Sequence, residues 1–549
     1  DQDGEAIIGA NIVEKETTNG TVTDIDGRFL LNVEEDGFLR ISYIGYVTQD
    51  IPISGTATFQ IVLQEDAESL DEIVVVGYGT MRKRDLTGSI SSIRTEKLSN
   101  QSPRTVQDIL RANAAGLNIG LATDAKAEAS LAIRGRGTLA SNSDPLIVLD
   151  GVIYDGALAN INPDDISSVD ILKDASSAAV YGAKAANGVI VFTTKKGKIG
   201  KPVITANATL AVAELADQPK ILDAQGFLKF RQDYNEGRNS DACLEQFPQI
   251  FTNPFELAGV NQLDWYNYDQ KEPVTSVTNE QLTTQWLSRL NLTTPEIENY
   301  FNGKITRWDD LVFQKALQQN YTVSVSNTTD YSSQYISLNW VDREGIITGD
   351  RYKTFRARVN AESKVASFLT IGINTQYAYR DEGYLKAWWD QMTMISPYGS
   401  NNINDPENIY KRRPTGLDPI NPFYDNMFTD LNDVKHNVNA KIYAEVSLPF
   451  DIHYTMNFTP YLHFAEYYRH YSSKGDNWKS IGGEATRRHS RRYNWQIDNI
   501  INWKKDFGDF HKAEVTLLAN AEKAQYWYTE ANAKTFSPSD ILGYHRIQA

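Results

Sequence analysis

From about residue 201 onward, apolar and polar side chains alternate at every second position along much of the chain. The clearest run is 437–448, where apolar residues alternate with polar ones such as Asn437, Lys441 and Glu445. A period of two indicates strands, because successive side chains of a strand point to opposite faces. Other runs with this period predict strands around residues 321–327, 336–340, 355–361, 452–458, 493–503 and 513–519.

The length of these runs and of the links between them favours a membrane barrel over a soluble sandwich. The longest runs reach about 11 or 12 residues, enough for a tilted strand to cross a bilayer, whereas strands of soluble sheets average ~5–6. Short links (328–332, 449–451, 506–509) alternate with long ones (214–319, 381–435). Transmembrane β-barrels show this asymmetry, and charged residues in the polar phase suit a water-filled lumen.

Two smaller regions with a different pattern precede the strands. In residues 1–64, short apolar runs are separated by turn pairs such as Asn19-Gly20 and Asp36-Gly37, which predicts a small Ig-like β-sandwich. Residues 80–198 predict a mixed α/β domain. Its expected helices cover 103–114, 163–169 and 175–181, and its expected buried strands cover 146–149 and 188–194.

The segment between these regions changes from an acidic stretch to a β-branched run. Residues 65–72 are rich in Asp and Glu, and Ile73–Val76 then lead into glycines. The run is either an ordinary strand of the next domain or an extended peptide that pairs with the sheet edge of a partner. The residues alone leave both interpretations open.

Composition excludes several classes of protein. The net charge of −16 argues against a general nucleic-acid surface. A single cysteine, Cys243, allows neither an internal disulfide nor a Cys-based zinc site, and its role is left open. No apolar run is long enough for a transmembrane helix. Neither an HExxH nor a GxSxG motif is present, so we predict no catalytic residues, no metal site, no cofactor and no enzyme activity.

The strand pattern also predicts that this chain holds only part of a barrel. It contains roughly eight or nine spanning strands by residue 530, and an unpaired sheet edge in hydrocarbon costs several kcal/mol per group. A closed eight-stranded barrel has an interior filled by side chains, with no room for the domain at 80–198. Either that domain lies outside the barrel, or the barrel is much larger and more strands follow; we favour the larger barrel.

Several ordered motifs resemble the SusC/RagA-like TonB-dependent transporters. Residues 70–79 (LDEIVVVGYG) resemble the TonB box of this family, and 145–152 (PLIVLDGV) resemble a segment of its plug. Residues 162–166 (NPDDI), 171–175 (ILKDA), 181–182 and 186–190 (ANGVI) are similar to the plug signature, and 133–135 to a further plug element. Residues 1–64 resemble the carboxypeptidase-regulatory-like domain that often precedes the plug.

The resemblance implies a mainly β protein with four segments. These are a periplasmic Ig-like domain (1–64), a linker with the TonB box (65–79), an α/β plug (80–198) and the N-terminal part of a 22-stranded antiparallel barrel (199–549). The rest of the barrel is expected beyond Ala549, and the first strand of the Ig-like domain is expected to be trimmed.

The resemblance also implies a function: TonB-dependent active import of a nutrient oligomer across the Gram-negative outer membrane. A SusD-like surface lipoprotein is the expected lid, in a dimer of SusC–SusD pairs, and the barrel contacts outer-membrane lipid. The box residues expected to pair with TonB are Asp71, Glu72, Ile73, Val74, Val75, Val76 and Gly77. Family frequency favours oligosaccharide over oligopeptide as cargo, and no nucleic-acid partner is expected. A passive porin, the main rival, needs neither box nor plug.

Aromatic residues in the link 381–435 are candidates for cargo binding. Trp388 and Trp389, with Tyr384 and Tyr398, could form a platform for sugar rings, whose apolar faces stack on aromatic side chains. Alternatively, they belong to an interfacial aromatic belt or pack the link itself. The sequence does not decide between these interpretations.

Overall fold

The computed structural model describes residues 6–547 with gaps. The longer gaps are 64–72, 83–89, 96–102, 136–143, 175–178, 239–248, 400–420 and 535–541. The shorter gaps are 8, 16, 18, 25, 34–36, 44–47, 54–57, 77–78, 112, 115, 123, 134, 199, 508–510 and 546. Cys243 therefore lies outside the described residues, as do Asp71, Glu72 and Gly77 of the predicted TonB box.

The chain divides into two compact units, residues 1–92 with 170–191 and residues 93–169 with 192–549. The first unit contains a four-stranded antiparallel sheet in the order β2-β1-β3-β4. Its strands are β1 (Asn11–Glu14), β2 (Gly20–Val22), β3 (Phe38–Ser42) and β4 (Gln49–Pro52). Ile12, Leu39 and Ile41 are buried in its core, where partly buried residues from 29–33 and 59–61 also pack.

The first unit also contains a short hairpin. Strand β5 (Ile73–Val76) pairs antiparallel with β6 (Gly79–Arg82), and Val75 lies opposite Thr80. The β-branched run therefore has the extended backbone that its composition predicts.

The predicted plug segment contains a five-stranded sheet in the order β11-β10-β13-β12-β7 and a two-stranded sheet of β8 and β9. These strands are β7 (Ile90–Arg94), β8 (Leu117–Ile119), β9 (Leu131–Ile133), β10 (Leu146–Leu149), β11 (Val152–Ile153), β12 (Ile166–Leu172) and β13 (Val189–Thr194). Helix α2 (Val106–Leu110) and the 3₁₀ turns η3 (Leu158–Asn160), η4 (Pro163–Asp165) and η5 (Ala179–Ala185) complete the segment. The strands expected at 146–149 and 188–194 are confirmed.

Two of the helix predictions in this segment are partly wrong. The helix expected at 163–169 is only the turn η4, because Ile166 and Val169 are buried β-branched residues of strand β12. The helix expected at 103–114 is only α2, because Thr105 caps its start and Arg111 leaves the helical conformation at ψ 129°.

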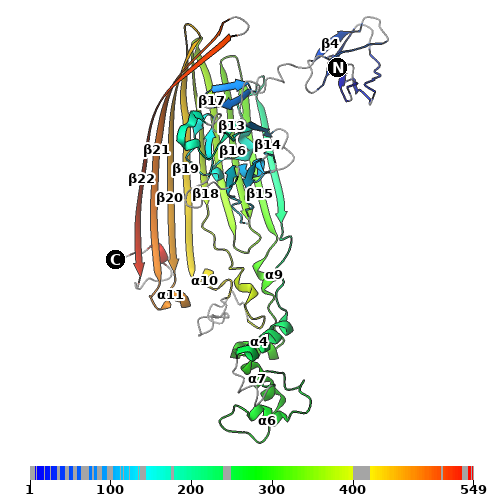
Figure 1. The fold of residues 1–549 in the computed structure, drawn as a ribbon, viewed down its shortest axis with the longest axis vertical. Coiled ribbons are helices and arrows are strands. Elements are labelled where there is room, and N and C mark those ends of the chain that lie inside the picture. Colours follow the sequence, from blue (N-terminus) through cyan, green and yellow to red (C-terminus); the bar gives the residue numbers. More distant parts are fainter. Residues whose placement is uncertain are drawn as a thin grey trace. The chain divides into compact units, whose positions relative to one another are not determined.

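The second unit contains a nine-stranded antiparallel sheet in which β14 to β22 follow one another in sequence order (Figure 1). The strands are β14 (Val203–Ala213), β15 (Ala316–Thr328), β16 (Ser332–Glu344), β17 (Arg351–Ala366), β18 (Leu369–Asp381), β19 (Thr429–Leu448), β20 (Ile452–Tyr471), β21 (Glu484–Phe507) and β22 (His511–Lys534). Every alternating run predicted from the sequence lies within one of these strands. The predicted count of eight or nine is confirmed, although β21 and β22 reach 24 residues each.

The links at the two ends of this sheet differ in length, as predicted. Tight links join β15 to β16, β17 to β18 and β19 to β20. The opposite end, called here the long-link end, carries the links β14–β15 and β18–β19 and the helices shown beyond the strands in Figure 1. These are α4 (Ala224–Arg238), α6 (Gln262–Asn267), α7 (Asn279–Arg289), α8 (Thr294–Phe301), α9 (Trp308–Val312), η6 (Gln391–Thr393), α10 (Tyr424–Met427), α11 (Asp476–Lys479) and η7 (Gly543–His545).

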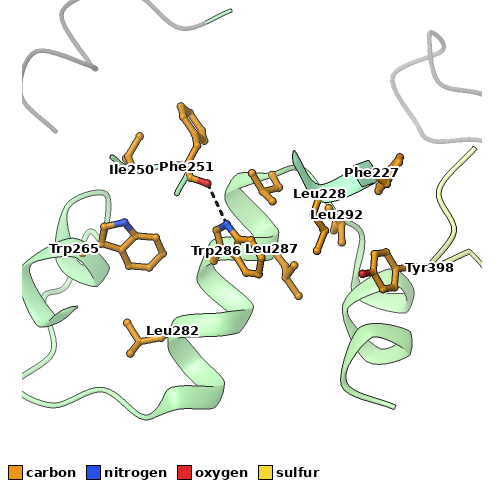
Figure 2. Close-up of a cluster of buried hydrophobic side chains, with 11 residues drawn as sticks. Phe227, Leu228, Ile250, Phe251, Trp265, Leu282, Trp286, Leu287, Leu292 and Tyr398 are labelled. Atoms are coloured by element: carbon orange, nitrogen blue, oxygen red, sulfur yellow. Dashed lines mark hydrogen bonds between the residues drawn. The ribbon is translucent and has the colours of Figure 1, made fainter. Parts of the chain in front are cut away.

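The helices of the β14–β15 link have a hydrophobic core of their own. Trp265, Leu282 and Leu287 are at most 1% exposed, and the Trp286 indole donates a hydrogen bond of 3.1 Å to the Phe251 carbonyl (Figure 2). Such a core lets a long link fold on its own packing.

On the nine-stranded sheet, apolar side chains are exposed on one face and polar side chains are buried on the other, which is the reverse of a soluble protein. In β16, Ile336, Leu338 and Trp340 are 43%, 50% and 40% exposed, whereas Ser337 and Asn339 are buried. We call these the apolar face and the polar face. Apolar side chains that point outward are expected of a barrel surrounded by lipid.

A continuous row of large side chains crosses the apolar face. The strand register places Tyr321 beside Trp340 and Trp340 beside Phe355. The row continues through Tyr379, His436, Phe464, Arg491 and Trp527. Aromatic residues concentrate where membrane meets water, so this row is the expected position of an interfacial belt. Among the described helices, none is both long and apolar enough to cross a bilayer.

Candidate functional site

A buried arginine on the polar face lies between two carboxylates of the plug segment. Arg358 of β17 has a side chain 3% exposed, and its guanidinium is 3.4 Å from Asp150 and 3.5 Å from Asp165. It also donates to Gln376 of β18. Breaking a buried ion pair on one side costs about 3–5 kcal/mol, because the remaining charge is left without a partner. This triad joins the plug segment to the sheet through buried charged groups.

A tight turn positions Asp150. Leu149 pairs with Val152, so Asp150 and Gly151 form the two-residue turn between β10 and β11, with φ values of 50° and 81°. Hairpin turns of this length favour Asp-Gly because both central residues need positive φ. The Asp150 carboxylate accepts hydrogen bonds from the amide (2.8 Å) and hydroxyl (2.9 Å) of Thr194.

A capped 3₁₀ turn positions Asp165. The Asn162 side chain accepts a bond from the Asp164 amide (3.2 Å) and donates one to Asp165 (3.2 Å). The Tyr335 hydroxyl, from β16, donates to the same carboxylate at 3.0 Å. Burial raises the pKa of Asp165, although Arg358 and the neighbouring hydroxyls act in the opposite direction. Burial in low dielectric penalises the charged form, and the Arg358 guanidinium opposes that effect.

Neighbouring polar residues of the sheet also bind the plug backbone. Arg356 donates two bonds to the Ala159 carbonyl, at 2.7 and 3.1 Å. Asn360 donates to the Thr194 hydroxyl (2.8 Å) and the Lys195 carbonyl (2.9 Å). These residues share the polar phase of β17 with Arg358, so one strand provides three adjacent anchors.

Strands on either side extend the contact. The Thr322 hydroxyl donates to Asp164 (2.7 Å), Gln376 donates to the Tyr154 hydroxyl (3.0 Å), and Lys441 donates to the Asp150 carbonyl (3.0 Å). We call the set of contacts from β15 to β19 the plug clamp. The contacts named here are hydrogen bonds and ion pairs, and water that enters can satisfy the same groups.

A second charged cluster lies near the end of β18. Glu382 is 2.6 Å from Lys435, 3.3 Å from Arg380 and 3.4 Å from Lys126 of the plug. Burial acts to raise the pKa of Glu382, but Arg380, Lys435 and Lys126 together lower it below its ordinary value. The cluster is therefore held in its charged form.

The sequence motifs identified the plug half of the clamp but not the half in the sheet. Asp150, Asp164 and Asp165 lie within the quoted motifs, whereas Arg356 and Arg358 lie only within the alternating run at 355–361. The missed signal is the spacing Arg356-x-Arg358-x-Asn360, which places three strong hydrogen-bonding groups on one face of a strand.

The structure describes part of the predicted TonB box. Of the seven box residues, Ile73, Val74, Val75 and Val76 form β5, which pairs on one side with β6. This is the backbone conformation that strand addition needs. Pairing of the box with TonB itself stays a prediction.

The four predicted platform residues occupy different environments. Trp388 and Trp389 are 47% and 45% exposed. Tyr384 is half-buried and donates to Asp381 at 3.0 Å. Tyr398 is 5% exposed, packs in the core of the β14–β15 link and donates to the Ala224 carbonyl at 3.3 Å. We therefore retain the two tryptophans as candidates and assign Tyr398 to that core (Figure 2).

Comparisons with known proteins agree with this architecture. The TonB-dependent receptor plug domain family matches residues 82–189, and the CarboxypepD_reg-like domain family matches residues 1–75. The TonB-dependent receptor SusC of Bacteroides thetaiotaomicron is 31% identical over 389 residues, which is 69% of this chain and 33% of that protein. The TonB-dependent receptor P26 of Formosa agariphila is 26% identical over 565 residues, 99% of this chain and 50% of that protein.

Solved structures show the same fold. The RagAB peptide importer in its open-open state superposes with a TM-score of 0.66 at 22% identity, covering 86% of this chain and 51% of that chain. The chain thus spans between a third and a half of the length of these proteins. With its plug, its carboxypeptidase-regulatory-like domain and its large antiparallel sheet, the chain belongs with the SusC/RagA-like TonB-dependent transporters of the outer membrane.

Proposed function

We propose that the protein imports a nutrient oligomer, an oligosaccharide, across the outer membrane in steps powered by TonB. The observation that carries the proposal is the plug clamp: a plug segment fixed to the polar face of the sheet by Arg358, Asp150 and Asp165. A passive pore gains nothing from a plug held by buried charges. A gated importer needs contacts that hold at rest and separate under force.

In this mechanism the box segment links the plug to the motor. Strand β5 presents an extended backbone, so its amides and carbonyls can pair with an added strand of TonB at little conformational cost. Force on the box is then transmitted to the plug, and the polar clamp separates as water enters. A SusD-like lipoprotein acts as the external lid, in a dimer of SusC–SusD pairs, and no catalytic step or cofactor is involved.

The test uses a strain whose protein carries Val74→Pro and Val75→Pro in the box. Its growth is measured on defined glycans and on defined peptides. Proline removes the amide donors that strand addition needs. The matched control is Val74→Thr with Val75→Thr, which keeps the amides and the β-branched shape. Protein level in the outer membrane is measured for each strain.

We expect loss of growth on one class of nutrient for the proline strain, with protein present, and normal growth for the threonine strain. Failure on glycans supports the oligosaccharide assignment, and failure on peptides supports a RagA-type peptide importer instead. Unchanged growth of the proline strain on every source that gene deletion impairs would leave a passive pore as the better account.

A further inference from the structure

The polar face of β20–β22 continues past the plug towards the long-link end. Asn494 of β21 donates to Asp155 of the plug at 2.8 Å, so the Asn494 side chain lies on the polar face. Arg492 and Arg488 precede Asn494 by two and six residues, and even spacing along a strand places their side chains on the same face. The register places Tyr467 of β20 opposite Arg488. These residues therefore line the polar face beyond the plug contact.

Cations and aromatic rings alternate along this face. The Tyr467 ring has the guanidinium carbons of Arg469 and Arg488 each 5.7 Å from its centroid. Arg469 also lies 4.7 Å from the centroid of Tyr471, and that ring stacks on Trp478 of α11 at 3.9 Å and 10°. The result is a stacked series that ends on a planar aromatic pair.

Strand β22 adds a second aromatic surface. Arg492 lies 5.8 Å from the centroid of Tyr526, and the rings of Tyr526 and Tyr528 are 6.1 Å apart at 27°. The strand register places both rings on the polar face, where sugar rings can stack on them.

The charges on this surface are not balanced. Glu530 pairs with Arg488 at 2.5 Å, and Glu484 pairs with Lys534 at 3.3 Å. Within the described part of the chain, Arg469 and Arg492 have no carboxylate within ion-pair distance. The Arg469 Nε is also buried without an acceptor there. Buried donors are normally satisfied, so among the described residues this N–H is a donor that a bound ligand could satisfy.

We propose that this surface, formed by Tyr467, Arg469, Tyr471, Trp478, Arg492 and Tyr526, binds an acidic oligosaccharide. Sugar rings stack on the aromatic faces, and the guanidinium groups of Arg469 and Arg492 bind carboxylate or sulfate oxygens. A neutral glycan would leave both arginines without an acceptor. The inference rests on the proposed import of oligosaccharide and names the chemical class of that cargo.

The experiment measures binding calorimetrically on the purified full chain in detergent, without TonB, so that its outcome is independent of the import test. The probes are a galacturonic-acid oligomer, a sulfated galactose oligomer, a neutral malto-oligosaccharide and an oligoglutamate peptide. The variant is Arg469→Gln with Arg492→Gln. The matched control is Arg487→Gln with Arg491→Gln, which removes the same charge from the apolar face of the same region.

We expect at least one acidic sugar to bind, with affinity falling by about tenfold or more in the variant and little in the control. Arg469→Lys with Arg492→Lys should retain part of the affinity, because charge remains without the planar fork. Equal loss in variant and control, preference for the neutral sugar or the peptide, or no binding of either acidic sugar each overturns the inference.

Discussion

The polar face of the sheet has the same alternation in β15–β18 and in β20–β22, but its side chains have different partners. In β17, Arg358 is 3% exposed and lies between two plug carboxylates. In β20 and β21, Arg469 and Arg492 face aromatic rings and lack a carboxylate partner among the described residues. In both regions the arginines lie on the polar face. Alternation along the strand therefore does not tell which arginine binds the plug and which is available to a ligand.

The difference follows from what covers each region. Where the plug covers the face, every charge must find a partner, because an unpaired buried charge is costly. Beyond the plug, Arg492 is exposed, and solvent tolerates its unpaired guanidinium, which can then bind the proposed cargo. We infer that one strand pattern serves two roles, plug retention and cargo binding, divided by where the plug ends.

Among the substitutions that distinguish the two regions, we expect Arg358→Ala to weaken retention of the plug the most. It leaves Asp150 and Asp165 buried without a cation, which should weaken plug retention by about 3–5 kcal/mol. Arg492→Ala, with an exposed arginine, should change plug retention little. Hydrogen exchange of the amides in 146–172 measures both. Equal protection in wild type and Arg358→Ala would remove the clamp from the account.

A smaller change sharpens the assignment of Asp165. Tyr335→Phe removes only the hydroxyl that donates to this carboxylate at 3.0 Å. Loss of one hydrogen bond to a charged group is worth about 1.5–3 kcal/mol, so protection should fall less than in Arg358→Ala. Tyr467→Phe, on the uncovered part of the face, is the control and should leave plug exchange unchanged.

The smallest expected effect is a dependence on pH near Lys126. The cations around Glu382 lower its pKa, so its contribution to stability is present above its ordinary pKa of 4.5 and is lost as pH falls through the lowered value. Amide protection around Lys126 should therefore decrease in acid below about pH 4 in the wild type. In Glu382→Gln, the loss of amide protection around Lys126 at acid pH should disappear. Identical pH profiles for the two proteins would show that Glu382 does not hold the plug.

The sequence predicted the local elements better than their long-range partners. Period-two runs located most strands of the large sheet, but β14 and β18 were not singled out, and strand lengths were underestimated because polar strand ends break the apolar alternation. The motifs marked Asp150 and Asp165, yet their common partner Arg358 lies about two hundred residues away. Only tertiary structure brings such residues together. The division into segments 1–64, 65–79, 80–198 and 199–549 stays a prediction.

The most direct test of the account asks whether the plug must separate from the sheet during import. In a Cys243→Ser background, Asp164→Cys and Thr322→Cys introduce thiols at side chains that are hydrogen-bonded at 2.7 Å. Uptake of a labelled cargo oligomer is then measured after cross-linking with a short cleavable bis-thiol reagent, with each single-cysteine protein as control. The account predicts that the cross-link blocks uptake and that cleavage restores it. Uptake at the uncross-linked rate with the plug held to the sheet would contradict it.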